Sequence, residues 1–176
     1  PALARAAGDA DVVVTSGGVS VGDADYVRDA VLEVGRLDFW KIALKPGKPL
    51  AVGRIGRADF FGLPGNPVST IVTFLLFVVP AIVRRGGGVP EPPLRLPARL
   101  AHDVRHTLGR REYQRGIVTE REDQLVVAAT GDQSSNRLAT FDGANCLIEV
   151  PGDRGNLAAH EVVSIVLLER GTGRLF

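Results

Sequence analysis

Apolar and polar residues along the first half of the chain predict strands and helices in alternation. Val12–Val14 is a run of β-branched residues, which favours a strand buried on both faces. Apolar residues recur at 3–4 spacing over 26–34 and predict a helix that Gly35 ends. The other predicted elements are a helix at 2–7, strands at 37–44, 50–55 and 59–63, the last two forming a hairpin, and a helix at 67–84. That last helix is apolar nearly all round, so we expect it to be kinked at Pro80 and buried against a sheet or a partner subunit.

The second half of the chain has a different pattern, which begins after a glycine- and proline-rich linker at 86–93. Short apolar runs separated by turn residues predict a small antiparallel barrel or sandwich. These runs are 94–100, 113–120, 125–130, 146–150 and 162–168. We therefore expect two domains: an α/β domain at 1–88, incomplete at its N-terminus, and a β domain at 89–176.

Composition narrows the class of protein. The chain has 176 residues, 45% of them hydrophobic, and a net charge of +1, so no broad electrostatic field favours nucleic acid or membrane partners. Cys146 is the single cysteine, which excludes an internal disulfide and favours a reducing, cytoplasmic location. The three histidines do not show a zinc-site spacing. The longest apolar stretch, 71–83, looks too short to cross a bilayer, which takes about 20 residues.

The start of the chain also carries information. The sequence contains no Met and begins with Pro1 inside a helix-like stretch. We therefore expect it to be a piece of a longer polypeptide.

The stretch from Thr15 to Asp25, TSGGVSVGDAD, is the first candidate site. It follows a strand and precedes a helix, where open α/β sheets bind ligands. Glycine allows backbone N–H groups to face an anion, and the hydroxyls of Thr15, Ser16 and Ser20 add donors. Asp25 could hold a metal ion that accompanies a phosphate. The alternative is a tight turn in which glycine serves geometry and serine caps the helix.

Lysine usage marks a second candidate. Arginine outnumbers lysine 18 to 3, yet Lys41, Lys45 and Lys48 all lie within one short segment. This clustering suggests a need for compact ammonium groups, although a chance cluster on a solvated loop is the alternative.

Three polar segments complete the candidates. The turn LPGNPVS at 63–69 places Pro67 in a first helical turn, and its alternative role is helix initiation only. In the second half, the loop at 131–137 could touch a ligand or be a solvated turn. The basic segment 110–115 could meet a phosphate or lie at a strand edge.

Taken together, TSGGVSVGDAD, KPGKP and LPGNPVS closely resemble the molybdopterin molybdenumtransferases, the MoeA proteins and the E domain of gephyrin. The segments EYQRG, TGDQSS and ANCLIEVP agree with that resemblance. It implies a molybdopterin-binding, MogA-like α/β domain followed by a small C-terminal β-barrel. It also implies an enzyme of molybdenum cofactor biosynthesis that inserts molybdenum from molybdate into adenylylated molybdopterin and releases AMP.

The resemblance further implies a divalent cation, Mg²⁺, and a homodimer in which an N-terminal domain of the partner completes the site. Other cofactor-synthesis proteins are further expected partners. Because the corresponding N-terminal domains are missing here, we expect this chain to be inactive by itself.

Site residues follow from matching positions. Asp25, Lys41 and Lys45 are the expected catalytic residues, with Asp25 also the metal ligand. Two departures from the family pattern are Asp23, where Glu is more common, and Ser134, which replaces a frequent Gly. The expected substrate-binding residues are Ser16, Gly17, Gly18, Ser20, Lys48, Pro64, Gly65, Asn66, Pro67 and Ser135.

Two other functions remain open from the sequence. One is a molybdopterin adenylyltransferase, which shares the α/β domain but does not need the second domain. The other is a gephyrin-like scaffold that binds a partner peptide, although retention of Asp25, Lys41 and Lys45 is what a ligand site requires.

Overall fold

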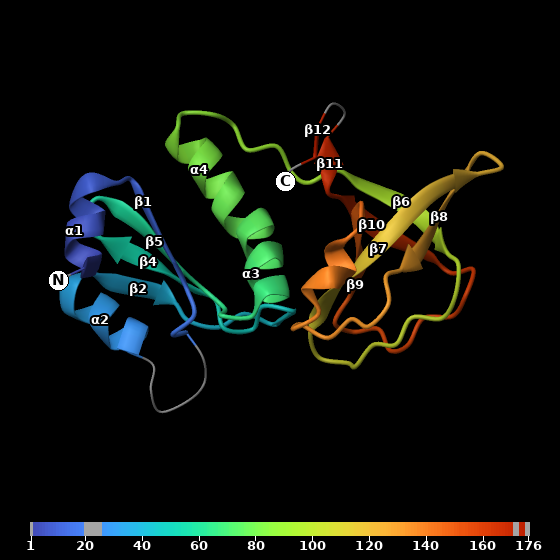
Figure 1. Cartoon of the computed structure of the whole chain (residues 1–176), viewed down its shortest axis with the longest axis horizontal. Helices are drawn as coiled ribbons and strands as arrows, with labels where there is room; N and C mark the ends of the chain where they lie inside the picture. The colour runs from blue at the N-terminus through green and yellow to red at the C-terminus, as the bar shows by residue number, and fades with distance from the viewer. Residues whose placement is uncertain (1, 20–25, 171–172, 175–176) are drawn as a thin grey trace. The chain divides into compact units, whose positions relative to one another are not determined.

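The computed structural model describes residues 2–19, 26–170 and 173–174 and divides the chain into two compact units (Figure 1). The first unit runs up to Ile42 and continues over Pro46–Glu91. The second unit comprises Ala43–Lys45 and the chain from Pro92 on. The sequence did not predict that Ala43–Lys45 belongs to the second unit.

A four-stranded sheet forms the centre of the first unit, in the order β1-β5-β4-β2. Strand β1 is parallel to β5, whereas β4 pairs antiparallel with β5 as the predicted hairpin and with β2. The strands are β1 (Val12–Ser16), β2 (Arg36–Phe39), β4 (Ala51–Ile55) and β5 (Ala58–Leu63).

Helices cover both faces of this sheet (Figure 1). Helices α1 (Ala2–Asp9) and α2 (Tyr26–Val34) bury Ala7 and Val31 against one face. Helix α3 (Pro67–Thr73) leads into the segment that packs Val78 and Phe74 on the other face. The α/β class is therefore confirmed for this unit.

The long apolar helix spans 67–85 without interruption. It consists of α3, a π-helical turn η1 (Phe74–Val78) and α4 (Val79–Arg85). Pro80 lacks an N–H and its ring would crowd the carbonyl four residues earlier, so a wide π turn directly before it relieves that clash. Only part of the helix is buried, since no residue of α4 is buried and the side chain of Ile82 is 46% exposed.

The prediction that no apolar segment is long enough to cross a bilayer is wrong. The helix at 67–85 has 19 residues and a mean hydropathy of 2.0, so it passes by length and composition. A core helix of a soluble protein passes the same test, and this helix packs on the sheet through Phe74, Phe77 and Val78.

Two strand predictions need correction. The segment 37–44 is not one strand: β2 ends at Phe39, and the separate β3 (Leu44–Lys45) pairs with a strand of the second unit. Strand β1 is not buried throughout, because it lies at the sheet edge and leaves Val14 40% exposed.

The second unit is a closed five-stranded barrel with β3 added beside β7. Strand order is β7-β8-β6-β10-β9, and a β7–β9 pairing closes it around a core that includes Leu100, Val127 and Ile165. The expected antiparallel arrangement holds except that β6 and β8 are parallel. The elements are β6 (Arg95–Leu100), β7 (Arg111–Arg121), β8 (Gln124–Ala129), η2 (Leu138–Phe141), β9 (Cys146–Val150), β10 (Val162–Leu167), β11 (Glu169–Arg170) and β12 (Gly173–Arg174).

Candidate functional site

The two predicted strand-end turns of the first unit lie side by side. Parallel pairing of β1 with β5 ends at Ser16 opposite Leu63, so the chain leaves both strands at the same edge. The Gly17 amide then donates to the Leu63 carbonyl at 3.0 Å. A Cβ on Gly65 would lie 3.2 Å from the Gly17 Cα, so the two turns touch through backbone atoms. The structure thus brings together two motifs that are far apart in sequence.

Glycine is required at the first turn. Gly17 has φ +85° and Gly18 has φ +71°, values that residues with a Cβ rarely adopt. A Cβ on Gly18 would also stand 2.4 Å from Val27 Cγ2 in α2. The backbone conformation and the packing of α2 both depend on these glycines.

The second turn begins helix α3 in an unusual way. Asn66 occupies the N-cap position and Pro67 follows, but the Asn66 side chain makes no capping hydrogen bond. Instead, the Thr70 hydroxyl donates to the Pro64 and Asn66 carbonyls. The Ser16 hydroxyl reaches the same Pro64 carbonyl at 3.4 Å. Pro64 is buried, whereas Gly65 and Pro67 are exposed.

Two polar atoms on these turns are buried without a hydrogen-bond partner among the described residues: Thr15 Oγ1 and Asn66 Oδ1. A buried polar atom without a partner costs about 1–3 kcal/mol. Natural proteins satisfy nearly all such groups, and exceptions occur at sites of function. Thr15, whose hydroxyl the sequence offers as a donor, joins the candidate site on this ground.

The three predicted lysines divide between the units. Lys41 and Lys48 are exposed residues of the first unit, and neither makes an ion pair with any residue the structure describes. Their loop is closed by the Ile42 amide, which donates to the Lys48 carbonyl at 3.1 Å. Lys45 belongs to the second unit, where its Nζ lies 3.0 Å from Glu112 Oε1.

Asp25 and Ser20, predicted as metal ligand and substrate contact, lie outside the described residues. Within the described ranges, no three His, Cys, Asp or Glu side chains are grouped so that they could hold a metal ion. The described residues therefore do not by themselves fit Mg²⁺.

The loop at 131–137, which carries the half-buried Ser135, is organised from beneath by Arg115. The Arg115 guanidinium donates to the carbonyls of Asp132, Gln133 and Ser134 at 3.0–3.2 Å, and its Nε donates to Thr140 Oγ1. Burial lowers the pKa of Arg115, against the opposing charges of Asp132 and Glu112. Arg115 is 0% exposed, so it neither lies on the surface nor has these donors free for a phosphate, which corrects both sequence interpretations of this residue.

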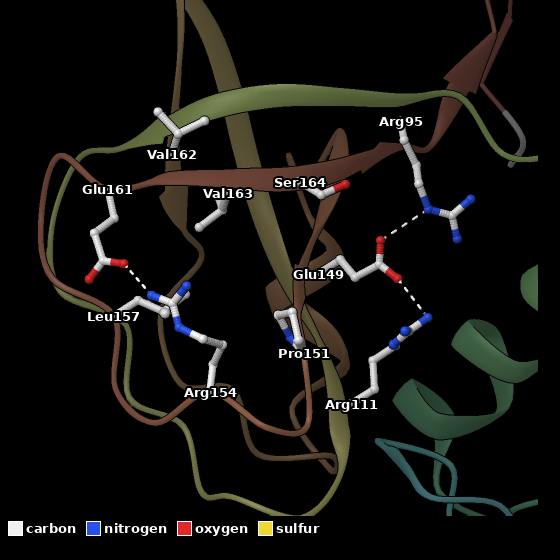
Figure 2. A pocket seen from close by; sticks show the side chains of 10 residues that line it. All are labelled: Arg95, Arg111, Glu149, Pro151, Arg154, Leu157, Glu161, Val162, Val163 and Ser164. Carbon is white, nitrogen blue, oxygen red and sulfur yellow. Dashed lines mark hydrogen bonds and ion pairs between the residues drawn. The ribbon is translucent and has the colours of Figure 1, made fainter.

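A pocket of about 410 Å³ opens on the barrel (Figure 2). Arg111 of the basic segment 110–115 lines it, but none of the expected catalytic or substrate-binding residues does. Glu149 forms ion pairs with Arg95 at 3.0 Å and with Arg111 at 3.2 Å, and Arg154 forms an ion pair with Glu161 (Figure 2). The five charged residues that line the pocket are therefore already paired with one another.

The Glu149 carboxylate also accepts from the Tyr113 hydroxyl at 2.9 Å. Burial alone would raise the pKa of Glu149, but the hydrogen bonds from Arg95 and Tyr113 hold it below its ordinary value. Burial together with the bond to Glu149 raises the pKa of Tyr113.

The sequence did not indicate that three polar residues, Glu112, His106 and Arg115, are buried. The segment 110–115, RREYQR, is mostly polar, so no hydrophobic pattern predicts the buried stretch at 112–116. The one usable signal is that these charges stand inside a predicted run of strands.

Comparison with known proteins agrees with the geometry. Residues 1–84 match the family described as "Probable molybdopterin binding domain", and residues 97–168 match "MoeA C-terminal region (domain IV)". A molybdopterin molybdenumtransferase of Haemophilus influenzae is 42% identical over 166 residues, which cover 93% of this chain and 41% of that protein. Gephyrin of Dictyostelium discoideum is 35% identical over 90% of this chain and 25% of its own length.

Solved structures show the same likeness. A molybdopterin biosynthesis MoeA protein from Pyrococcus horikoshii has a TM-score of 0.76 and 31% identity, over 96% of this chain and 40% of that one. A molybdenum cofactor biosynthesis protein from Pyrococcus furiosus has a TM-score of 0.68 and 26% identity, over 94% of this chain and 52% of that one. The chain thus spans about half of these relatives or less. The two domain matches, their order and the structural likeness show that the chain belongs to the family of MoeA proteins and the gephyrin E domain.

Proposed function

We propose that this chain is part of a molybdopterin molybdenumtransferase that inserts molybdenum from molybdate into adenylylated molybdopterin and releases AMP. The observation that carries the proposal is the contact between the turns at 15–18 and 64–67. On these turns Thr15 Oγ1 and Asn66 Oδ1 are buried and have no hydrogen-bond partner within the part of the chain that the structure describes. The name of the Haemophilus influenzae relative supports the transferase class.

Backbone and side chains have distinct roles in this proposal. The glycine turn would hold the pterin or its phosphates through backbone N–H groups such as that of Gly18, where no side chain shields the backbone, since the Gly17 amide already donates to the Leu63 carbonyl. Such groups position a substrate rather than react with it. Thr15 and Asn66 would supply the polar contacts that fix its orientation.

The lysines would supply positive charge. Phosphates and molybdate are both oxyanions, and hydrogen bonds between an ammonium and an oxyanion are roughly twice as strong as neutral ones. Lys41 and Lys48 are free of ion pairs to the residues described in the structure, and Lys45 uses one of its three N–H donors on Glu112. Together they would stabilise the charge that develops as AMP leaves.

Several further features remain part of the proposal. They are a divalent cation held through Asp25, a contact from Ser135, a cytoplasmic location, other cofactor-synthesis proteins as partners, and a homodimer whose partner completes the site. No nucleic acid or membrane partner is included. These features rest on the family resemblance and on composition.

Molybdate-dependent AMP release tests the proposal. The complete gene product that contains this chain, and the 176-residue chain alone, are each given adenylylated molybdopterin with and without molybdate and Mg²⁺. We expect the complete product to release AMP only when molybdate is present, and the chain alone to release none. Absence of molybdate-dependent release from the complete product would remove the enzyme assignment.

The two alternatives are less well supported. An adenylyltransferase would not need a region like MoeA domain IV, yet residues 97–168 of this chain match that domain. A scaffold of the gephyrin type has support from the gephyrin relative alone. Lys45→Ala separates the enzyme from the scaffold, because it should cripple turnover and leave partner binding intact.

A further inference from the structure

Strand pairing places Lys45 directly beside a buried carboxylate. Strand β3 runs parallel to β7 with Lys45 opposite Glu112, and Lys45 Nζ lies 3.0 Å from Glu112 Oε1. The Lys45 side chain is 45% exposed, whereas that of Glu112 is 3% exposed. One end of this ion pair is therefore fixed in the barrel and the other faces solvent.

The second oxygen of Glu112 faces a buried histidine. Glu112 Oε2 is buried with no hydrogen-bond partner among the described residues, and His106 Nε2 lies 3.8 Å from it. The His106 side chain is only 1% exposed. Water therefore does not screen the interaction between the two groups.

Hydrogen-bond partners hold the His106 ring in a fixed orientation. Nδ1 lies 2.8 Å from the Arg154 carbonyl and Nε2 lies 2.9 Å from the Arg110 carbonyl. The ring is therefore held from both sides against Glu112 Oε2. The His106 amide also donates to Asn156 Oδ1 at 2.9 Å, which fixes the backbone of this residue.

We propose that Glu112 is a positioning residue that holds the Lys45 ammonium in place, with the buried His106 ring packed beside its second carboxylate oxygen. The inference rests on the proposed function, in which Lys45 acts on the substrate. Glu112 takes one of the three N–H donors of the Lys45 ammonium, and the exposed end of that ammonium keeps the other two for an incoming oxyanion.

Arg115 is the other charged group that interacts with Glu112 from β7, and it is fully occupied by the loop at 131–137. It adds positive charge to the surroundings of Glu112 but presents none of it to solvent, because Arg115 is 0% exposed. Of these two cations, only Lys45 carries its charge outward.

Turnover tests the positioning role. In the complete gene product, Glu112→Gln keeps the size of the side chain and removes its charge, so Lys45 loses its anchor. We expect kcat for AMP release to fall about tenfold to a hundredfold, since misplacement by about 1 Å can cost that much. Glu112→Asp should restore part of the rate. Glu120→Gln, at an exposed glutamate of the same strand, is the matched control and should leave kcat unchanged.

A double-mutant cycle shows whether the effect passes through Lys45. In a Lys45→Ala background, Glu112→Gln should reduce kcat no further, because there is no ammonium left to position. If the two losses multiply, Glu112 acts independently of Lys45 and the proposal is wrong.

Nitrogen NMR of the isotope-labelled 176-residue chain provides a readout that needs no activity. We expect the Lys45 ammonium signal to move on Glu112→Gln but not on Glu120→Gln. An unmoved Lys45 signal in Glu112→Gln overturns the proposal. If the wild-type complete product releases no AMP while these signals behave as expected, the proposed function fails and the positioning of Lys45 stands.

Discussion

The glycine turn of the first unit and the loop at 131–137 of the second are both predicted ligand loops, but different groups hold them. The glycine turn is fixed by one backbone bond, from Gly17 to Leu63, and Thr15 Oγ1 is left buried without a partner among the described residues. The second loop is fixed by Arg115 and Gln133, whose side chains bond backbone groups of the loop and of β7, and Arg115 also bonds the Thr140 hydroxyl. Unpaired atoms indicate readiness for a ligand, whereas a satisfied network indicates a scaffold that presents Ser135.

The largest expected effect concerns the Arg115 network that supports the loop at 131–137. Arg115→Leu removes the donors for three loop carbonyls and should lower the free energy of unfolding by about 3–5 kcal/mol, as breaking buried charged networks does. Denaturant unfolding measures it. Arg121→Leu, at an exposed position of the same strand, is the control and should change little. Equal effects of the two changes would contradict the role assigned to Arg115.

On the glycine-turn side, the expected effect is smaller. Gly18→Ala combines a positive φ with a Cβ 2.4 Å from Val27, and should destabilise the chain by about 2 kcal/mol. Gly56→Ala also has a positive φ, +58°, but meets nothing within 4 Å. It should therefore cost only about 1 kcal/mol. Thermal unfolding of both variants separates crowding against α2 from backbone strain. The idea fails if Gly56→Ala is the more damaging change.

The next largest expected effect on stability comes from the ion pairs of the barrel pocket, and it depends on pH. The folded-state pKa of Glu149 lies below its ordinary value, so the unfolded chain binds more protons there. Glu149 therefore stabilises the folded chain at pH values above its unfolded-state pKa. This stabilisation is lost as the pH falls through its folded-state pKa. Glu149→Gln should remove about 1 kcal/mol near neutral pH and flatten the acid limb of the stability curve. An acid limb that matches the wild type would refute this.

Cys146 should show the smallest effect. Burial raises the pKa of this thiol to about 12, so almost no thiolate exists at neutral pH. A thiol reagent at pH 8 should therefore label the chain only as it unfolds. Between the ordinary thiol pKa and pH 12 the unfolded state binds fewer protons, so the Cys146 contribution to stability falls as the pH rises. Rapid labelling of the folded chain is the result that does not fit.

Local patterns predicted the elements that local residues determine. The helix at 26–34 has the predicted bounds because its apolar spacing and Gly35 are both local signals. The barrel strands lie close to their predicted ranges for the same reason. The prediction of one strand over 37–44 was wrong because Leu44 and Lys45 pair with β7, whose position the sequence does not reveal.

For the candidate site, the sequence identified the residue types but not their surroundings. Ser16, Gly17, Pro64 and Asn66 could be proposed from motifs, and parallel pairing of β1 with β5 then brings their turns together. The burial of Glu112 and Arg115 depends on barrel closure, which no local pattern encodes. Asp25 and Ser20 stay predictions.

The most direct test of the ligand-facing turn is Thr15→Val in the complete gene product. Valine keeps the shape of threonine and removes a hydroxyl that has no partner in the described ranges, so stability should stay equal or rise by about 1 kcal/mol. The affinity for adenylylated molybdopterin, measured by calorimetry, should fall about five- to tenfold with the loss of one hydrogen bond. Thr73→Val, which removes a buried hydroxyl bonded to the Ser69 carbonyl, should leave that affinity unchanged. Unchanged affinity in Thr15→Val would mean that the ligand does not bind at this edge of the sheet.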